Sequence, residues 1–274
     1  MNLIKPSFEI LEQAPGIQGV KKQIERAGRT CYKSEDKITD TSCEEFVNRM
    51  VNSGHGAMLE HGTVYLKFYN TRKWVSEYSL EDSTYMGSFF TNNKYSKVNQ
   101  VGDTMYVTTN YRVLVENNQL DYLRYICEPT EHHEKRITVK FICDRGVSHE
   151  FVRHRVSSFA QESTRYCNYM KDKFGTSVSF IYPEWLQDSE YLEFEEDCRI
   201  LEIMYAKWIN KGWTAQQARY FLPTGVKTEL IMTAFVSDWN HFFDLRCHST
   251  AHPQARELAI PLKEKLNEYL TNNL

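Results

Sequence analysis

The chain has 274 residues, of which 41% are hydrophobic and 25% charged, the balance of an ordinary soluble globular protein with a substantial core. Its formal net charge of -3 argues against a general nucleic-acid-coating protein, which would need a basic surface. No apolar run approaches the roughly 20 residues that span a bilayer, and the N-terminus lacks a signal-peptide pattern.

The seven cysteines are scattered, odd in number and without a Cys-x-x-Cys pair. This pattern fits reduced thiols better than a disulfide framework or a structural zinc site. We therefore expect a cytoplasmic protein that binds no metal and associates with neither nucleic acid nor membrane.

The first strong helix signal covers residues 43–53. Ser42 and Glu45 have the spacing of a capping box, apolar residues follow on one face, and Gly54 supplies a stop. A helix is therefore predicted over this range.

Two strands are predicted from alternating apolar residues, one over 64–68 and one over 137–143. Between them lies a polar region rich in Asn and Tyr, roughly residues 70–135. Its helix signals are weak except over 110–125, where we predict a helix.

From Ser148 onward the pattern becomes helical. The predicted helices are 189–210 with Gly212 as its stop, a short helix between the Thr214–Gln217 capping box and Pro223, a long apolar helix over 227–246, and a last helix starting at Pro253. Strands grouped early and helices late indicate an α+β class, a helix-rich single domain over 1–274 with a small, mostly antiparallel sheet.

The segment 150–165 concentrates polar chemistry. It holds three arginines, a histidine and three serines. Arginine forks match phosphates and carboxylates, and Ser and backbone N–H groups can complete a phosphate cradle. The residues alone therefore leave two readings open, an anionic-ligand site and a solvated basic helix face.

Arg219 and Arg246 lie in apolar surroundings, where an unpaired charge is costly. Each should pair with an acid, such as Asp244 or Glu229, or meet a ligand. Taken separately, a structural ion pair is the better expectation for each.

The pattern Arg153-His154-Arg155, seven spacers and Ser163 resembles the signature of flavin-dependent thymidylate synthases. Further pieces similar to that family are Gly54-His55-Gly56-Ala57-Met58-Leu59-Glu60-His61, Gln161 to Tyr166, Ala218 to Pro223, and Phe243 to Arg246. They occur in the family's order and cover most of the chain.

The resemblance implies an enzyme that makes dTMP from dUMP. The methylene group would come from methylenetetrahydrofolate, and the reducing equivalents from NADPH through bound FAD. It also implies a homotetramer whose active sites are shared between subunits.

The resemblance also implies residue roles. The dUMP contacts would be Glu150, Arg153, Gln161, Glu162, Ser163, Thr164, Arg165, Arg219 and Arg246. The FAD contacts would be His55, Ala57, Glu60, Arg153, His154, Arg155, Ser237 and His241. Arg246 would activate the uracil ring by stabilising negative charge. Ser163 is expected to be a ligand contact, because an alkoxide nucleophile needs an adjacent base.

Several positions depart from the family pattern. Glu150 stands where the family often has Gln, and it would need an arginine partner beside an anionic nucleotide. Phe235, Val236 and Ser237 stand where many members have Asn-x-Arg, and Ala57 replaces a threonine. The 70–135 region is enlarged relative to compact members.

Neither a GxGxxG nor a GxxxxGK[ST] motif occurs, so flavin binding rests on the resemblance. Two alternatives stay open. One is a non-catalytic protein that binds nucleotides or RNA through the arginine segment, although the acidic balance counts against it. The other is a homologue that binds FAD but has lost catalysis.

Overall fold

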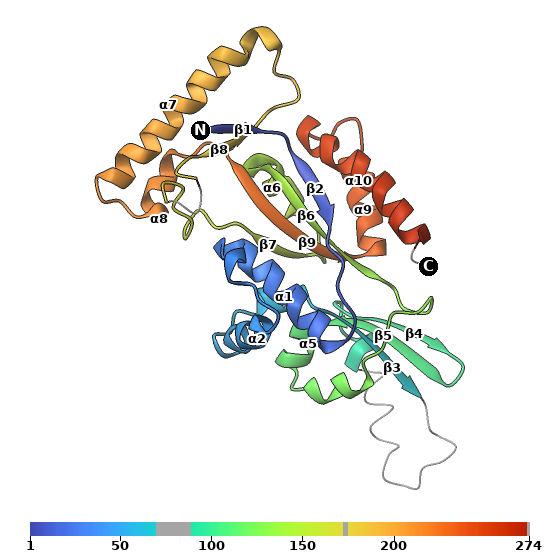
Figure 1. Cartoon of the computed structure of the whole chain (residues 1–274). Coiled ribbons are helices and arrows are strands. Elements are labelled where there is room, and N and C mark those ends of the chain that lie inside the picture. The colour runs from blue at the N-terminus through green and yellow to red at the C-terminus, as the bar shows by residue number, and fades with distance from the viewer. Residues whose placement is uncertain (70–88, 172–174, 273–274) are drawn as a thin grey trace.

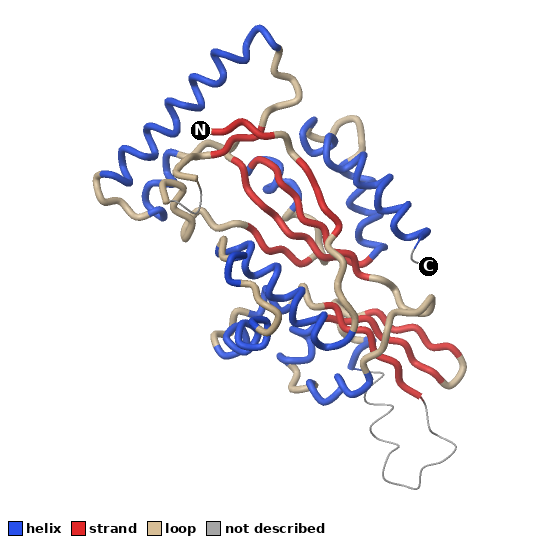
Figure 2. Tube along the Cα trace, in the orientation of Figure 1, coloured by secondary structure: helices blue, strands red, loops and turns tan. Residues whose placement is uncertain are grey.

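A computed structural model describes residues 1–69, 89–171 and 175–272 (Figure 1). Helices flank three small sheets, two antiparallel and one a parallel pair (Figure 2). The predicted α+β class with small, mostly antiparallel sheet is confirmed. Among the helices in the described ranges, none has the length and apolar character needed to cross a membrane.

The central sheet has four strands in the order β2-β6-β9-β7, each antiparallel to its neighbours. Its strands are β2 (Ser7–Ile10), β6 (Arg136–Asp144), β9 (Lys227–Phe235) and β7 (Ser158–Gln161). Three helices pack against one face, namely α6 (Arg145–Phe151), α9 (Val236–Arg246) and α10 (Pro253–Asn272). Helix α6 begins directly after β6, and helix α9 begins directly after β9.

The predicted helix over 227–246 is wrong in its first half, which forms β9. Leu230 and Met232 pack toward α9 and α10, whereas Ile231 packs toward α1 on the opposite face. A strand buried on both faces is apolar throughout and has no period of two, so it cannot be distinguished from a buried helix by periodicity.

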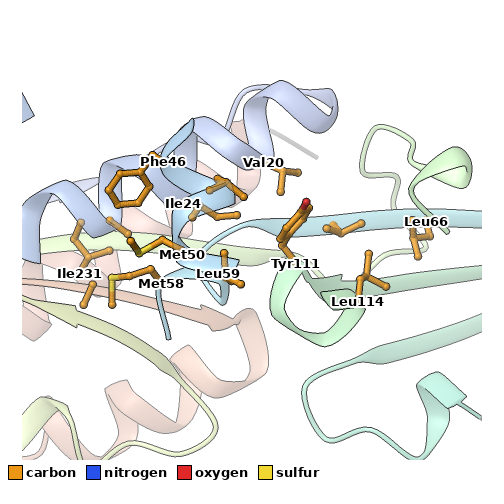
Figure 3. Packing of buried hydrophobic residues seen from close by; sticks show 14 of the residues in the cluster. Val20, Ile24, Phe46, Met50, Met58, Leu59, Leu66, Tyr111, Leu114 and Ile231 are labelled. Atoms are coloured by element: carbon orange, nitrogen blue, oxygen red, sulfur yellow. The ribbon is translucent and has the colours of Figure 1, made fainter. Parts of the chain in front are cut away.

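A second region joins a three-stranded antiparallel sheet to the N-terminal helices. The sheet has the order β3-β5-β4, with β3 (Thr63–Tyr69), β5 (Thr104–Asn110) and β4 (Lys97–Val101). The helices are α1 (Gly16–Tyr32), α2 (Ser42–Asn52), α3 (Gly56–Leu59) and α5 (Tyr111–Glu116), with short 3-10 helices η1 (Glu35–Lys37) and η2 (Leu120–Tyr125). Figure 3 shows the hydrophobic core that these elements share. It includes Phe46 of α2 and also Ile231, which comes from β9 of the central sheet.

The third region contains α7 (Tyr191–Asn210), which extends along the edge of the molecule (Figure 1). It is preceded by the parallel pair β1 (Asn2–Ile4) and β8 (Ser179–Ile181) and by the 3-10 helix η4 (Asp188–Glu190). It is followed by α8 (Ala215–Ala218) and the 3-10 helix η5 (Arg219–Phe221). Trp208 of α7 stacks on Phe221 of η5 with ring centroids 5.5 Å apart, which anchors this connection.

The predictions for β3, β6, α2, α7, α8 and α10 are confirmed, including the Thr214–Gln217 capping box. The capping box at Ser42 is wrong, because Thr41 is the N-cap and the Ser42 hydroxyl donates to Glu25. The helix expected over 110–125 is only α5 followed by η2.

The grouping of strands before helices is also wrong. The helices α1, α2 and α3 precede β3, and β7, β8 and β9 all follow Ser148. Within the 70–135 region, residues 70–88 lie outside the described residues, and the remainder supplies β4, β5, α5 and η2. This region therefore completes the sheet that β3 begins.

Candidate functional site

Arg246, the last residue of α9, is held by the end of α6 and the loop that follows it. Its Nη1 donates to Glu150 Oε2 at 2.8 Å, and its Nη2 donates to the Glu150 backbone oxygen at 2.7 Å. Its Nε donates to His154 Nε2 at 2.9 Å. With every nitrogen engaged, the guanidinium has a fixed orientation at the C-terminal end of α9.

His154 is buried and neutral. Burial, the nearby Arg246 cation and His241 together lower the pKa of His154 to about 4. The ring nitrogen can therefore accept a hydrogen bond from Arg246 Nε–H, which a charged imidazolium could not do. The exposed His241 ring lies edge-on at 5.9 Å and extends the same surface.

Glu150 is shared between two arginines, because Arg153 Nη1 also lies 3.1 Å from its Oε1. The expected ion pair of Arg246 is therefore confirmed, although its partner is Glu150 and not Asp244 or Glu229. Glu150, Arg153, His154, His241 and Arg246 are called the Arg246 cluster below. Its two guanidiniums and one carboxylate leave one net positive charge at a surface where Arg153 is 67% exposed.

The turn after β7 brings the second set of predicted residues together. Gln161 ends the strand and donates to Ser148 of α6 at 2.8 Å, which links this turn to the helix that carries Glu150. The Ser163 backbone N–H donates to the Cys31 oxygen at 3.1 Å, and the Ser163 hydroxyl accepts from the Arg165 backbone N–H at 3.3 Å.

Arg165 extends from this turn to α8, where its Nε donates to Gln216 at 2.5 Å. Arg219 starts η5 three residues further on, and both arginines are exposed. The fold therefore places two predicted nucleotide-binding arginines at one surface, although they are far apart in the sequence.

Beneath this turn lies a buried set of ion pairs, the lysine network. Its members are Lys33, Lys140, Glu162, Lys227 and Glu229, together with Glu35, which pairs with Lys33 at the outer end. Burial alone would raise the pKa of Glu229, but Lys227 and Lys33 lower it far below its usual range. Lys227 also lies 2.7 Å from Glu162, whose other oxygen accepts from Tyr169 at 2.9 Å. Glu162 is therefore enclosed under the turn and supports it from below.

An aromatic hollow opens beside the same turn. Tyr32 lies between two rings, with Tyr166 at 5.6 Å between centroids and His55 at 6.0 Å, and its hydroxyl is 2.8 Å from His55 Nδ1. The hollow has a volume of about 760 Å³ and is lined by Arg29, Tyr32, Ser34, Asp36, Lys37, Arg49, Met50, Ser53, His55 and Tyr166. Arg29 is paired with Glu25 at 2.9 Å, so Lys37 and Arg49 against Asp36 leave the wall one net positive charge.

Other predicted residues lie apart from these contacts. Glu60 pairs with Arg112 at 2.6 Å, and Ser237 bonds Glu134 through its hydroxyl and its backbone N–H. Ser237 and Arg246 are at opposite ends of α9, about 13 Å apart along the axis. Ala57 packs against the core, Thr164 is buried, and Arg155 is exposed.

Most of the aromatic hollow could not be predicted from the sequence. Arg29 and Arg49 are in the last turns of α1 and α2, where basic residues are ordinary because they complement the helix dipole. Tyr32 had no motif of its own. Only the adjacency of Tyr166 to the arginine segment could have indicated a ring surface here.

Comparisons with known proteins place the chain among related sequences. The model of the family described as thymidylate synthase complementing protein matches residues 116–270. A flavin-dependent thymidylate synthase of Pyrococcus furiosus is 32% identical over 127 residues, covering 45% of this chain and 51% of that protein. The Pyrococcus horikoshii enzyme of the same name is 34% identical over 126 residues, with the same two coverages.

A flavin-dependent thymidylate synthase of Geobacter sulfurreducens is 32% identical over 120 residues, covering 43% of this chain and 50% of that protein. The chain thus spans about half the length of the curated relatives it matches. Among solved structures, a UMP/dUMP methylase PolB from Streptomyces cacaoi bound with 5-Br UMP aligns with a TM-score of 0.46 and 13% identity. This alignment covers 98% of this chain and 92% of that one.

Proposed function

Because the chain belongs to the thymidylate synthase complementing protein family, whose model covers more than half of it, we propose that it is a flavin-dependent thymidylate synthase. It converts dUMP to dTMP, with methylenetetrahydrofolate as the carbon donor and NADPH as the source of reducing equivalents. The observation that carries this proposal is the Arg246 cluster, which holds a guanidinium of fixed orientation at a surface with unbalanced positive charge.

The cationic surfaces fit an anionic nucleotide. In the proposed complex, Arg165 and Arg219 engage the phosphate of dUMP, since exposed guanidiniums match phosphate oxygens bidentately. Gln161 and Ser163 complete that contact from the turn after β7. Glu162 acts from below, by holding the turn through Lys227.

Arg246 is the proposed activating residue. The uracil ring must gain negative charge before its carbon can attack the methylene donor, and a preoriented guanidinium stabilises that charge. The neutral His154 ring and the Glu150 carboxylate keep the guanidinium in place. Ser163 supplies no nucleophile, because its hydroxyl contacts the Arg165 backbone N–H rather than a base.

The aromatic hollow fits FAD in size, charge and ring surface. Its volume is within the range of cofactor pockets, its cations suit a pyrophosphate, and Tyr32, His55 and Tyr166 offer flat faces. FAD, when bound, supplies the hydride that reduces the transferred carbon. His55 borders the proposed flavin position, whereas Glu60 and Ser237 lie away from the hollow, engaged by Arg112 and Glu134.

We also propose a cytoplasmic homotetramer with active sites shared between subunits. All seven cysteines are free thiols, as expected for a reducing compartment. The exposed position of Arg155, Arg165 and Arg219 leaves them accessible to a neighbouring subunit.

Two measurements test the function. The purified protein should be yellow from bound flavin, and dUMP should be required for oxidation of the reduced flavin, with dTMP formed only when methylenetetrahydrofolate is added. A yellow protein that forms no dTMP would favour a homologue without catalysis. A colourless protein that binds RNA with steep salt dependence would favour the RNA-binding alternative.

A further inference from the structure

The long helix α7 has apolar residues on two opposite faces. On the inward face, the buried Cys198 and Tyr205 pack in the hydrophobic core of the third region, and Phe194, Leu201 and Trp208 pack against it. The outward face exposes Ile200 at 48% and Ile203 at 58%. Leu192 and Met204 extend this exposed surface toward the two ends of the helix. A helix that is apolar on both faces usually has both faces covered.

The charges of α7 are divided between its two ends. The first half carries Glu193, Glu195, Glu196 and Asp197, whereas Lys207 and then Lys211 lie at the far end. Glu196, Ile200, Ile203 and Lys207 fall within one sector of about 60° on the helix, at 100° per residue. The outward stripe therefore runs from acidic through apolar to basic.

This order is complementary to itself when the helix is reversed. We propose that the outward face of α7 docks against α7 of a second copy of this chain, antiparallel and related by a two-fold axis. With the axis beside the 201–202 peptide, Ile200 of one copy faces Ile203 of the other, and Glu196 faces Lys207. Each contact occurs twice, as an isologous interface requires.

Within the described part of its own chain, Glu196 has only a weak ion pair that could compete with the proposed pairing to Lys207 of the second copy. Glu196 lies 3.7 Å from Arg199 within the same helix, but both side chains are more than half exposed, so this pair contributes little.

Charge reversal in the full chain tests the pairing by sedimentation velocity over a dilution series. Glu196→Lys and Lys207→Glu should each halve the mass of the assembly and weaken self-association about tenfold or more, because each creates two like-charge pairs. The double variant Glu196→Lys/Lys207→Glu should restore association to about the wild-type level. Lys265→Glu, an exposed charge on α10, is the matched control and should change nothing.

A disulfide checks the register independently. Ile200→Cys/Ile203→Cys should form a covalent dimer on mild oxidation, whereas the wild-type chain with its own cysteines should not. Both side chains are exposed, so thermal melting should confirm an intact fold. A wild-type monomer at every concentration, single reversals without effect, a double variant as weak as the singles, or no disulfide dimer would each overturn the antiparallel pairing.

Discussion

The Arg246 cluster and the lysine network are both built from cations and carboxylates, but they differ in balance and exposure. In the lysine network, Lys33, Lys140 and Lys227 supply three positive charges, and Glu162, Glu229 and the adjoining Glu35 supply three negative charges. In the Arg246 cluster, two arginines share one carboxylate. The balanced set is enclosed beneath the turn, and the unbalanced set opens to solvent.

This difference separates structural ion pairs from a ligand site. A buried charge must be paired within the protein, since leaving it unpaired is costly. A cation at an open surface can instead be paired by a ligand. Removing a carboxylate should therefore destabilise the fold in the lysine network, but should improve ligand binding in the Arg246 cluster.

The largest effect is expected from Glu229→Gln. This change leaves Lys33, Lys140 and Lys227 around a neutral buried group, and the free energy of unfolding should fall by about 3–5 kcal/mol. Urea unfolding followed by circular dichroism measures it. The matched control is Glu35→Gln at the partly exposed end of the network, which should cost about 1 kcal/mol or less. An equal loss of unfolding free energy in both variants would contradict the claim that Glu229 is buried among its lysine partners.

A smaller effect concerns acid stability. The pKa of His154 is lowered to about 4, whereas an unfolded histidine titrates near 6.5. Below pH 6.5 the unfolded chain binds a proton that folded His154 takes up only near pH 4. Its contribution to the free energy of unfolding is therefore full above pH 6.5 and is lost as the pH falls to about 4.

Urea unfolding of the wild type and His154→Gln at pH 7 and pH 4.5 isolates this contribution. The glutamine can still accept from Arg246, and other titrating groups, including buried His61, are common to both proteins. The variant should lose about 1–2 kcal/mol less than the wild type between the two pH values. Identical losses would mean that His154 does not remain neutral in the folded protein.

Glu150→Gln should tighten dUMP binding by about fivefold to tenfold. The carboxylate competes with an anionic nucleotide for Arg153 and Arg246, and the amide can still accept from Arg246 without that charge. Isothermal titration calorimetry on the flavin-loaded protein measures the change. Glu116→Gln, which alters an arginine–glutamate pair on α5, is the control. Weaker binding in Glu150→Gln would show that the carboxylate itself contacts the nucleotide.

The smallest effect is expected from Ser237→Ala. Its hydroxyl bonds Glu134 at the far end of α9 from Arg246, so dUMP affinity should change by less than about twofold. A larger loss in the same titration would place Ser237 in the nucleotide site.

Local signals were sufficient for part of the fold. The alternation in β3 and β6, the cap at Thr214 and the proline at the start of α10 each depend on residues a few positions apart. β9 could not be predicted in this way. Its strand character depends on pairing with β6 and β7, which no local pattern in a strand buried on both faces records.

The candidate site divides in the same manner. Arg153 to Ser163 form one contiguous motif, which can be recognised from the sequence alone. The partner of Arg246 is Glu150, 96 residues away, and the fold alone determines which acid reaches it. The aromatic hollow likewise forms only when α1 places Tyr32 beside Tyr166.

The central claim is that Arg246 activates the substrate ring and that the enzyme uses no serine nucleophile. The most direct test is dTMP formation from dUMP by Arg246→Ala and Ser163→Ala, measured together on flavin-loaded protein that melts like the wild type. Ser163→Ala should retain measurable turnover, while Arg246→Ala should lose about a thousandfold or more. Comparable residual activity in the two variants would contradict this division of roles.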